Sequence, residues 1–502
     1  MISSQMQSEN TLKDLELLIR SRYGLILLDT IEEERAETLL AHLADSLTLP
    51  VFFWTRTKGL RRSGEKTAVY GSTSASGALE HIENSDLPAL YVFHGLWDYM
   101  SDKITGAKLM DASSGFSSKR GAILLTGTPA ELPENLRPMS AVYRLPRPGM
   151  AEYRALLSRI IRDLSRKIDL RVAISDADTN RLLTNIKGLT MMEAEKILTR
   201  VMVEDSQLTP DDVRSVSLAK KELVEKEGLL EYYPAENSMA DIADLAGLKA
   251  WLAKRKEMSM NPDGARDFGL SFPRGILLTG VQGCGKSLCA KAVAMEWGFP
   301  LLKLDPSNLY NKYIGESERN FRRAIKTAEQ MAPVVLWIDE IEKAFASSAS
   351  GSDDGVSLRI FGTFLSWLQD RKAEVFVVAT ANDISRLPPE FIRKGRFDEI
   401  FFVDLPTPEA RKAIFVIHLK KRGREPGNFD LPALVRISDG FNGAEIEQAV
   451  VAGLYTAFSS KKKLSTELLT AEIHATNPLS RTMAEKIAEL REWSKGRTVS
   501  AQ

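Results

Sequence analysis

The stretch Gly280-Val281-Gln282-Gly283-Cys284-Gly285-Lys286-Ser287 decides the fold of the second half of the chain. It directly follows the apolar run Gly275-Ile276-Leu277-Leu278 and opens a segment typical of a helix. This order predicts a strand, a glycine-rich turn and a helix N-terminus, where backbone N–H groups surround phosphate groups. We therefore expect a phosphate-binding loop (P-loop) that holds a nucleoside triphosphate.

The residues of the P-loop are expected to have separate roles. Lys286 reaches the terminal phosphates and the hydroxyl of Ser287 holds Mg²⁺, so ATP and Mg²⁺ are the expected cofactors. Other residues of the predicted phosphate site are Gly280, Val281, Gln282, Gly283, Cys284, Gly285 and Leu288. Cys284 has two interpretations: a thiol with a lowered pKa that responds to oxidants, or a small residue that fits the loop. Hydrolysis is expected, and binding without turnover is the alternative.

Length and composition bound the remaining possibilities. A chain of 502 residues is too long for one hydrophobic core, and 67 basic residues balance 67 acidic ones, which excludes a general nucleic-acid polyelectrolyte. Two cysteines exclude a disulfide framework. We find no signal-peptide pattern at Met1–Gln5 and no apolar run long enough to span a bilayer, so we expect a soluble protein without membrane insertion.

The two halves of the chain repeat one pattern. Five apolar segments, beginning at Gly24, Leu49, Leu90, Ala122 and Ala141, have counterparts at Gly275, Phe299, Val334, Val375 and Phe401, at nearly matching offsets. The last segment of each half is followed by a similar pair of prolines, in Leu145-Pro146-Arg147-Pro148 and in Leu405-Pro406-Thr407-Pro408. Short apolar runs that alternate with helical periods favour a mostly parallel sheet covered on both faces. Each half is therefore predicted to be a five-stranded α/β unit followed by a helical lid.

The first copy lacks the residues needed for phosphate chemistry. Where a P-loop would follow the first strand, it has Asp29-Thr30-Ile31-Glu32-Glu33-Glu34, whose carboxylates would repel phosphate. We interpret it as a degenerate module kept for assembly or partner binding. The expected domains are 1–150 (degenerate α/β domain), 151–235 (helical region and linker), 236–406 (large α/β ATPase domain) and 407–502 (helical lid and C-terminal helix). Tyr232-Tyr233-Pro234 is expected in the joint between the halves.

Carboxylates follow the third strand of the second half. The run Val334–Ile338 ends in Asp339 and Glu340, where Asp339 can hold Mg²⁺ and Glu340 can orient and deprotonate the attacking water. The next strand delivers Asn382 to the same sheet edge, where it could sense the γ-phosphate. Without the P-loop, the acidic pair would be equally consistent with a solvated turn, and Asn382 with a turn residue.

These motifs resemble those of the AAA+ ATPase superfamily, from about residue 244 to the lid near Ser459. The segment Leu387–Asp398 is similar to the second region of homology of that superfamily. The resemblance implies that Arg393 and Arg396 are arginine fingers that act on ATP in the neighbouring subunit. The alternative is a surface salt-bridge cluster. A finger acting in trans requires head-to-tail contacts, which close into rings, so we expect a homo-hexamer.

Other expected roles come from the same resemblance. Asp244-Leu245-Ala246-Gly247 is similar to the segment that contacts adenine, which implies base contacts at Leu245 and Ala246. His418 lies where the superfamily has a lid histidine near the nucleotide, and Gly443-Ala444-Glu445 matches its second sensor region. The run Lys312-Tyr313-Ile314 is similar to the first pore loop, in which an aromatic side chain grips an extended polypeptide. The alternative for Tyr313 is packing against its own loop.

Nearly the whole chain is similar to an uncharacterised AAA ATPase family encoded in algal plastid genomes and in cyanobacteria. The resemblance rests on the degenerate first module, the amino-acid sequence of the P-loop and the tail from Asn477 to Trp493. It implies a cytoplasmic or stromal location and a link to the regulation of photosynthesis or carbon uptake. It does not identify the client.

Three functions are consistent with the sequence. The first is an ATP-driven remodeller that translocates a protein partner through a central pore. The second is a nucleotide-gated scaffold with slow turnover. The third is a nucleic-acid motor, which is less expected because only Lys312 adjoins the candidate pore tyrosine. The sequence therefore predicts an ATPase in each case.

Overall fold

A computed structural model describes the chain except for residues 1, 101, 128–133, 227, 234–244, 261, 307–315, 345–353, 372, 385–386 and 394. The chain divides into two compact units, Met1–Ser217 and Leu218–Gln502. The boundary lies inside a helix that the sequence places in the helical region before the linker.

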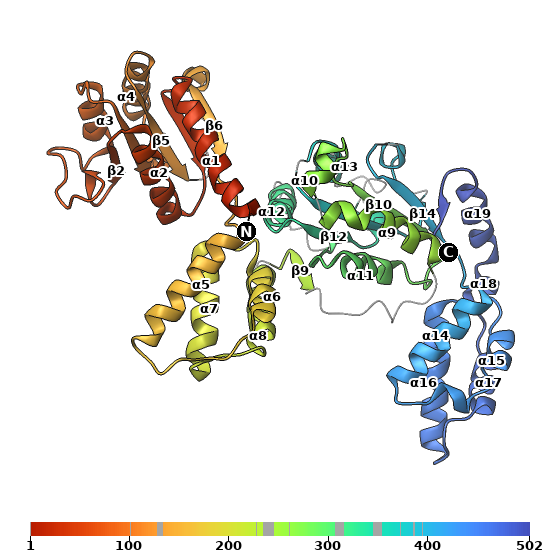
Figure 1. Cartoon of the computed structure of the whole chain (residues 1–502). Coiled ribbons are helices and arrows are strands. Elements are labelled where there is room, and N and C mark those ends of the chain that lie inside the picture. The colour runs from red at the N-terminus through yellow and green to blue at the C-terminus, as the bar shows by residue number, and fades with distance from the viewer. Residues whose placement is uncertain are drawn as a thin grey trace. The chain divides into compact units, whose positions relative to one another are not determined.

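The first unit contains an α/β part and a helical part (Figure 1). The α/β part consists of α1 (Ile2–Arg20), β1 (Leu25–Asp29), α2 (Glu33–Leu47), β2 (Val51–Thr55), β3 (Gly59–Arg62), α3 (Ala75–Glu83), β4 (Ala89–His94), α4 (Lys103–Ser114), β5 (Gly121–Gly127) and β6 (Ser140–Arg144). The helical part consists of α5 (Met150–Ser165), β7 (Arg171–Val172), α6 (Asp176–Ile186), α7 (Met191–Asp205), β8 (Gln207–Leu208) and α8 (Asp212–Glu225), which crosses the unit boundary.

The second unit repeats this organisation. Its α/β part consists of β9 (Leu230–Tyr233), α9 (Ala246–Met260), α10 (Pro262–Asp267), β10 (Gly275–Gly280), α11 (Lys286–Trp297), β11 (Leu301–Leu304), α12 (Glu316–Gln330), β12 (Val334–Ile338), α13 (Asp354–Asp370), β13 (Val375–Ala381) and β14 (Glu399–Val403). The lid and the segment after it consist of α14 (Pro408–Lys421), α15 (Leu431–Ile437), α16 (Gly443–Ser459), α17 (Thr466–Ala475), α18 (Leu479–Thr482), α19 (Ala484–Ser494) and β15 (Val499–Ser500).

Five parallel strands form the core of each sheet, as the sequence predicts. The strand order is β3-β2-β4-β5-β1-β6 in the first unit and β15-β14-β10-β13-β12-β11-β9 in the second. The five shared strands therefore have the same order, second-third-fourth-first-fifth. Strands β4 and β13 are buried along their whole length, which explains their continuous apolar sequence. The prediction of an α/β chain with two related modules is confirmed.

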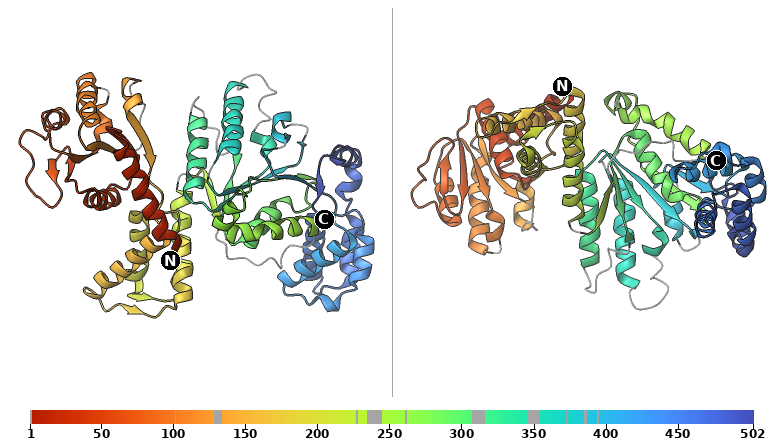
Figure 2. Two further views of the ribbon diagram at one scale, coloured as in Figure 1. Left: turned by 45° about the horizontal axis from the view of Figure 1, so that its top comes forward. Right: turned by 90° about the horizontal axis from the view of Figure 1, so that it is seen from below.

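Helices cover both faces of each sheet (Figure 2). In the second unit, side chains of α9 and α11 pack with one face of the strands, and side chains of α12 and α13 pack with the other. In the first unit, α1 and α2 cover one face while α3 and α4 cover the other. This layering leaves the carboxyl ends of the parallel strands as the place where ligands bind.

Three edge strands are not predicted by the sequence pattern. Strand β3 pairs antiparallel with β2, and β9 pairs antiparallel with β11. Tyr232 of β9 is buried in the core of the second unit, so this stretch is part of the sheet, where the sequence analysis expected an inter-domain joint. The third edge strand, β15, pairs parallel with β14. Edge strands of two to four residues carry too short a pattern to be recognised from alternation alone.

The helical parts of the two units begin one helix in the same way. The side chain of Thr190 caps α7 and Glu193 returns the bond to the Thr190 backbone, which is a capping box. Asn442 and Glu445 form the corresponding capping box on α16.

No helix in the described part of the chain combines the length and the apolarity that crossing a membrane requires.

Candidate functional site

The P-loop connects β10 to α11 in the second unit. Gly283 and Gly285 have φ angles of +78° and +87°, a region that favours glycine, so the loop can fold tightly before the helix starts. The ammonium of Lys286 donates hydrogen bonds of 2.9 Å to the carbonyl oxygens of Gly280 and Val281. The loop thus holds its lysine side chain along its own backbone.

The environment of Lys286 favours contact with an anion. Its side chain is buried, and this burial lowers its pKa, while Cys284, Glu342, Cys289 and Asp339 act in the opposite direction. A buried cation gains strongly from a negative partner because the local dielectric is low. Terminal phosphates would provide such a partner.

A chain of hydrogen bonds joins the P-loop to the ends of β12 and β13. The Ser287 hydroxyl donates to Asp339 Oδ1 over 3.3 Å, and the Thr380 hydroxyl donates to the same oxygen over 2.6 Å. Thr380 Oγ1 also accepts from the backbone N–H of Glu340 at 2.9 Å. Glu340 itself has a φ of +47°, in the left-handed region that is unusual for a glutamate. The predicted Mg²⁺ residues Ser287 and Asp339 therefore lie together.

Asn382 completes this arrangement at the end of β13. Its side-chain amide donates to Glu340 Oε1 over 2.8 Å, and its backbone N–H donates to Glu342 Oε1 over 2.9 Å. Burial raises the pKa of Glu342, and the other oxygen of this carboxylate is buried without a hydrogen-bond partner among the described residues. The ends of two strands thus bring Asp339, Glu340 and Asn382 to one edge of the sheet, as the sequence predicts.

The lid contacts the P-loop directly. The side-chain amide of Asn442 donates to the Gln282 carbonyl over 3.2 Å, and the backbone N–H of Ala444 donates to the Gly283 carbonyl over 3.2 Å. A Cβ atom on Gly283 would meet the Asn442 amide at 2.7 Å, so only glycine allows this approach. The start of α16 is therefore fixed against the predicted phosphate-binding loop.

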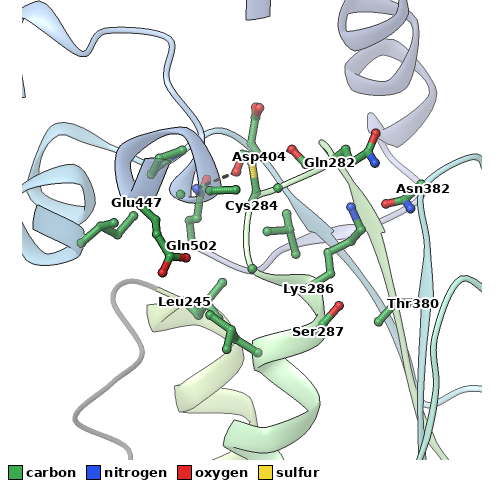
Figure 3. Close-up of a pocket in the computed structure, with 18 of the residues that line it drawn as sticks. Leu245, Gln282, Cys284, Lys286, Ser287, Thr380, Asn382, Asp404, Glu447 and Gln502 are labelled. Carbon is green, nitrogen blue, oxygen red and sulfur yellow. Dashed lines mark hydrogen bonds between the residues drawn. The ribbon is translucent and has the colours of Figure 1, made fainter. Parts of the chain in front are cut away.

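A cavity of about 360 Å³ lies between the P-loop, the strand ends and the lid (Figure 3). It is lined by Leu245, Gln282, Gly283, Cys284, Gly285, Lys286, Ser287, Leu288, Asp339, Glu340, Thr380, Asn382, Val403, Asp404, Pro406, Ile414, Ile417, His418, Lys421, Gly443, Ala444, Glu447 and Gln502. One end is polar, around Lys286 and Asp339, and the other is rich in apolar side chains from α14. Of the predicted nucleotide contacts, Ala246, Gly280 and Val281 do not line this cavity.

His418 lies on the lid side of the cavity, within α14. Its Nδ1 is 3.4 Å from Glu447 Oε1, which is also 3.1 Å from Arg422 Nη2. Burial lowers the pKa of His418, Glu447 raises it, and Arg422 and Lys421 lower it further. The imidazole is therefore held neutral near pH 7.

Cys284 does not have the reactive character that its position in the loop suggested as one interpretation. Burial raises the pKa of its thiol to about 12, and this effect outweighs the opposing charge of Lys286. The thiol stays protonated at neutral pH, and a protonated thiol is a poor nucleophile. The structure therefore favours the interpretation of Cys284 as a small residue that fits the loop.

The predicted arginine fingers lie away from the P-loop of their own chain. Arg393 is exposed, and Arg396 donates a hydrogen bond of 2.6 Å from Nη1 to the Glu390 carbonyl. Neither arginine is among the residues that line the cavity. The predicted pore residues Lys312, Tyr313 and Ile314 lie outside the described residues.

Several residues at the site were not assigned a role from the sequence, among them Thr380, Glu342, Asn442 and Gln502. Thr380 lies two residues before Asn382, at the end of a strand that the sequence predicts. Because side chains alternate along a strand, this spacing indicates that Thr380 and Asn382 point to the same face of the sheet. Glu342 lies two residues after Glu340, and Asn442 directly precedes Gly443. Gln502 is distant in sequence from every motif, and no local pattern points to it.

Three family models match the chain. The ATPase family associated with various cellular activities (AAA) matches residues 276–405. The N-terminal domain of the SpoVK-like AAA ATPases matches residues 11–145, and their second domain matches residues 151–227. The matched AAA region contains the P-loop and the strand ends described above. The chain is therefore an ATPase, as the sequence predicts.

Curated relatives extend the match to nearly the whole chain. An uncharacterized AAA domain-containing protein ycf46 from Pyropia yezoensis is 35% identical over 489 residues, which cover 97% of this chain and 98% of the relative. Its counterpart from Guillardia theta is 34% identical and covers 96% of this chain and 94% of the relative. A proteasome-activating nucleotidase from Aeropyrum pernix is 36% identical over 211 residues, 41% of this chain and 51% of that relative.

Proposed function

The chain belongs to the family of AAA domain-containing proteins called ycf46, and from this premise we propose that it is a ring-forming ATPase that remodels or translocates a protein partner through a central pore. The similarity to a proteasome-activating nucleotidase supports a protein client. Neutral overall charge speaks against nucleic acid as the substrate.

The observation that carries this proposal is the contact between the lid and the P-loop. Asn442 and Ala444 bind carbonyl oxygens of the loop that would surround the phosphates. Binding or loss of the γ-phosphate changes the loop, so it also changes the free energy of the lid position. A lid that moves with nucleotide state is what a remodeller needs to perform mechanical work.

The same site supports the assignment of hydrolytic roles. Ser287 and Asp339 offer hard oxygen ligands close together, which suits Mg²⁺ with its remaining positions taken by water and phosphate. Bound Mg²⁺ would neutralise charge on the phosphates. Glu340 would take the proton of the attacking water, and Asn382 would keep that carboxylate in place. Lys286 would contact the terminal phosphates.

The proposed assembly is a homo-hexameric ring. Arg393 and Arg396 do not line the cavity of their own chain, so their proposed role requires a neighbouring subunit. On the resemblance alone, we also propose a location in the cytoplasm or plastid stroma and a role in regulating photosynthesis or carbon uptake. The regulatory role is tested by comparing the growth of a strain that lacks the protein at low and at high inorganic carbon.

The client class is tested by the ATPase rate of the full chain with an unfolded polypeptide. Severalfold stimulation that Tyr313→Ala abolishes and Tyr313→Phe retains supports the remodeller. Tyr455→Ala, a change at an exposed lid tyrosine, is the matched control and should leave stimulation intact. A flat rate with ATP-dependent particle mass would instead support a scaffold, and salt-sensitive stimulation by single-stranded nucleic acid a motor.

A further inference from the structure

Residues 499–502 form a short strap at the edge of the second sheet that is joined to β14. Val499 and Ser500 pair in parallel register with Phe401 and Phe402. Strand β14 in turn pairs with β10, which leads into the P-loop. The strap therefore extends the same sheet that positions the nucleotide site.

The strap is firmly held at Ala501. This residue is fully buried in the cluster that also contains Leu245 and Leu248. Its N–H donates to the Phe402 carbonyl over 3.0 Å, and its carbonyl accepts from the N–H of Leu248 at 3.1 Å, near the start of α9. A Cβ atom on Gly247 would meet the Ser500 carbonyl at 2.6 Å, so the helix and the strap are in close contact.

This anchoring delivers the side chain of Gln502 to the cavity. Gln502 is one of its lining residues, and in Figure 3 it lies on the side of Leu245 and Glu447, away from Thr380 and Asn382. The P-loop and Ser287 fix the end of the cavity that receives the phosphates. The side with Leu245 and the apolar residues of α14 is therefore the end that receives the base.

The orientation of the Gln502 amide follows from its partners. Its nitrogen donates to the carbonyl oxygens of Asp404 and Leu405, at 3.3 Å and 2.9 Å. Two carbonyls can only face the NH₂ group, because an amide oxygen at that position would repel them. Both N–H groups are thereby used, and the amide offers a base only its oxygen, which is a hydrogen-bond acceptor.

Resting on the ATP site of the proposed function, we propose that Gln502 is a specificity-determining residue that selects adenine over guanine nucleotides. Its oxygen accepts a hydrogen bond from the exocyclic amine of adenine. Guanine has a carbonyl oxygen at the corresponding ring position, so two acceptors would face each other. Leaving a buried acceptor without a donor costs more binding free energy than a matched hydrogen bond contributes. The single amide of Gln502 can therefore discriminate against guanine.

The test compares ADP and GDP dissociation constants of the full chain by calorimetry, for the wild type and Gln502→Met. Methionine keeps the length and packing of the side chain and removes the acceptor. We expect ADP binding to weaken about five- to tenfold and GDP binding to strengthen as the clash between acceptors is removed, so that the selectivity ratio falls by at least the same factor. Gly247→Val, which displaces the strap through Ser500, should lower the ratio as well.

The outcomes separate this inference from the proposed function. If the wild type binds ADP and the ratio is unchanged in both variants, Gln502 does not read the base, while the ATPase assignment stands. If the wild type binds neither nucleotide, both fail. Lys286→Ala is the matched control, because losing a phosphate contact should weaken ADP and GDP equally and leave the ratio as it is. Thermal unfolding of each variant verifies that the fold is intact.

Discussion

The side-chain amide of Asn382 donates a 2.8 Å hydrogen bond to the carboxylate of Glu340, which lies 42 positions earlier in the chain. The bond connects the ends of two neighbouring strands, β12 and β13. The other oxygen of Glu340 forms an ion pair with Lys343, so both oxygens of the carboxylate have partners. Glu340 is thus oriented before any substrate arrives, which reduces the reorganisation required in the transition state.

Glu340→Gln should abolish most hydrolysis and preserve nucleotide binding. An amide cannot take the proton of water, so we expect turnover to fall on the order of a hundredfold or more. Steady-state phosphate release and ATP titration measure the two effects separately. Glu492→Gln, at an exposed glutamate of α19, is the control and should retain wild-type turnover. Normal turnover in Glu340→Gln would refute the role assigned to this carboxylate.

Asn382→Ala should slow hydrolysis less than Glu340→Gln. The substitution removes the side-chain donor to Glu340 and leaves the backbone bond to Glu342 in place. We expect a decrease in kcat on the order of tenfold to a hundredfold with little change in ATP affinity, since the carboxylate remains but loses its orientation. Single-turnover measurements check this. A change confined to affinity would place Asn382 in binding alone.

Two inactive variants should complement each other if the arginines act in trans. Lys286→Ala weakens nucleotide binding and removes hydrolysis in its own subunit, and the double substitution Arg393→Ala with Arg396→Ala leaves the P-loop intact. In rings mixed at equal amounts, about a quarter of the sites combine an intact P-loop with intact neighbouring arginines. The ATPase rate of the mixture should exceed that of either variant. Arg181→Ala, at an exposed arginine of the first unit, should be active alone. No gain on mixing would contradict fingers in trans.

Glu32→Ala should loosen the first unit. Glu32 Oε1 accepts a 2.6 Å bond from the backbone N–H of Met191, and Oε2 is 3.2 Å from Arg35 Nη1. The Glu32 side chain is only 8% exposed, and its removal leaves the partly buried N–H of Met191 without this partner, at a cost of about 1 kcal/mol. Hydrogen exchange at the start of α7 should accelerate accordingly. Glu33→Ala changes an exposed neighbour and should leave exchange unaffected.

Acidification should destabilise the lid through His418. Its pKa is lowered in the fold by burial, so the unfolded chain binds the proton more readily. This part of the stability is present above the ordinary pKa of 6.5 and is lost as the pH falls through that value towards the folded pKa. The loss of thermal stability between about pH 7.5 and about pH 5.5 should be smaller in His418→Gln. An equal loss in both proteins would assign the effect to other groups.

The sequence predicted most of the candidate site in the second unit, because the residues proposed for hydrolysis lie at the ends of strands. Asp339, Glu340 and Asn382 each follow a buried apolar run, and parallel strands end at one edge. Tertiary contacts determined what escaped prediction. Gln502 reaches the cavity only because a two-residue strand pairs with β14. The pKa of Cys284 depends on burial by surrounding elements, which a sequence does not reveal.

After its first strand, the first unit has the carboxylate of Glu32 where the second unit has the P-loop. Glu32, after β1, holds the start of α7, which matches the helix that the P-loop contacts in the second unit. A ligand that is part of the chain never dissociates, and no change in the ratio of ATP to ADP alters its occupancy. The contact that positions α7 in the first unit is therefore independent of bound nucleotide, whereas the corresponding contact of α16 is made to the loop that is expected to hold it.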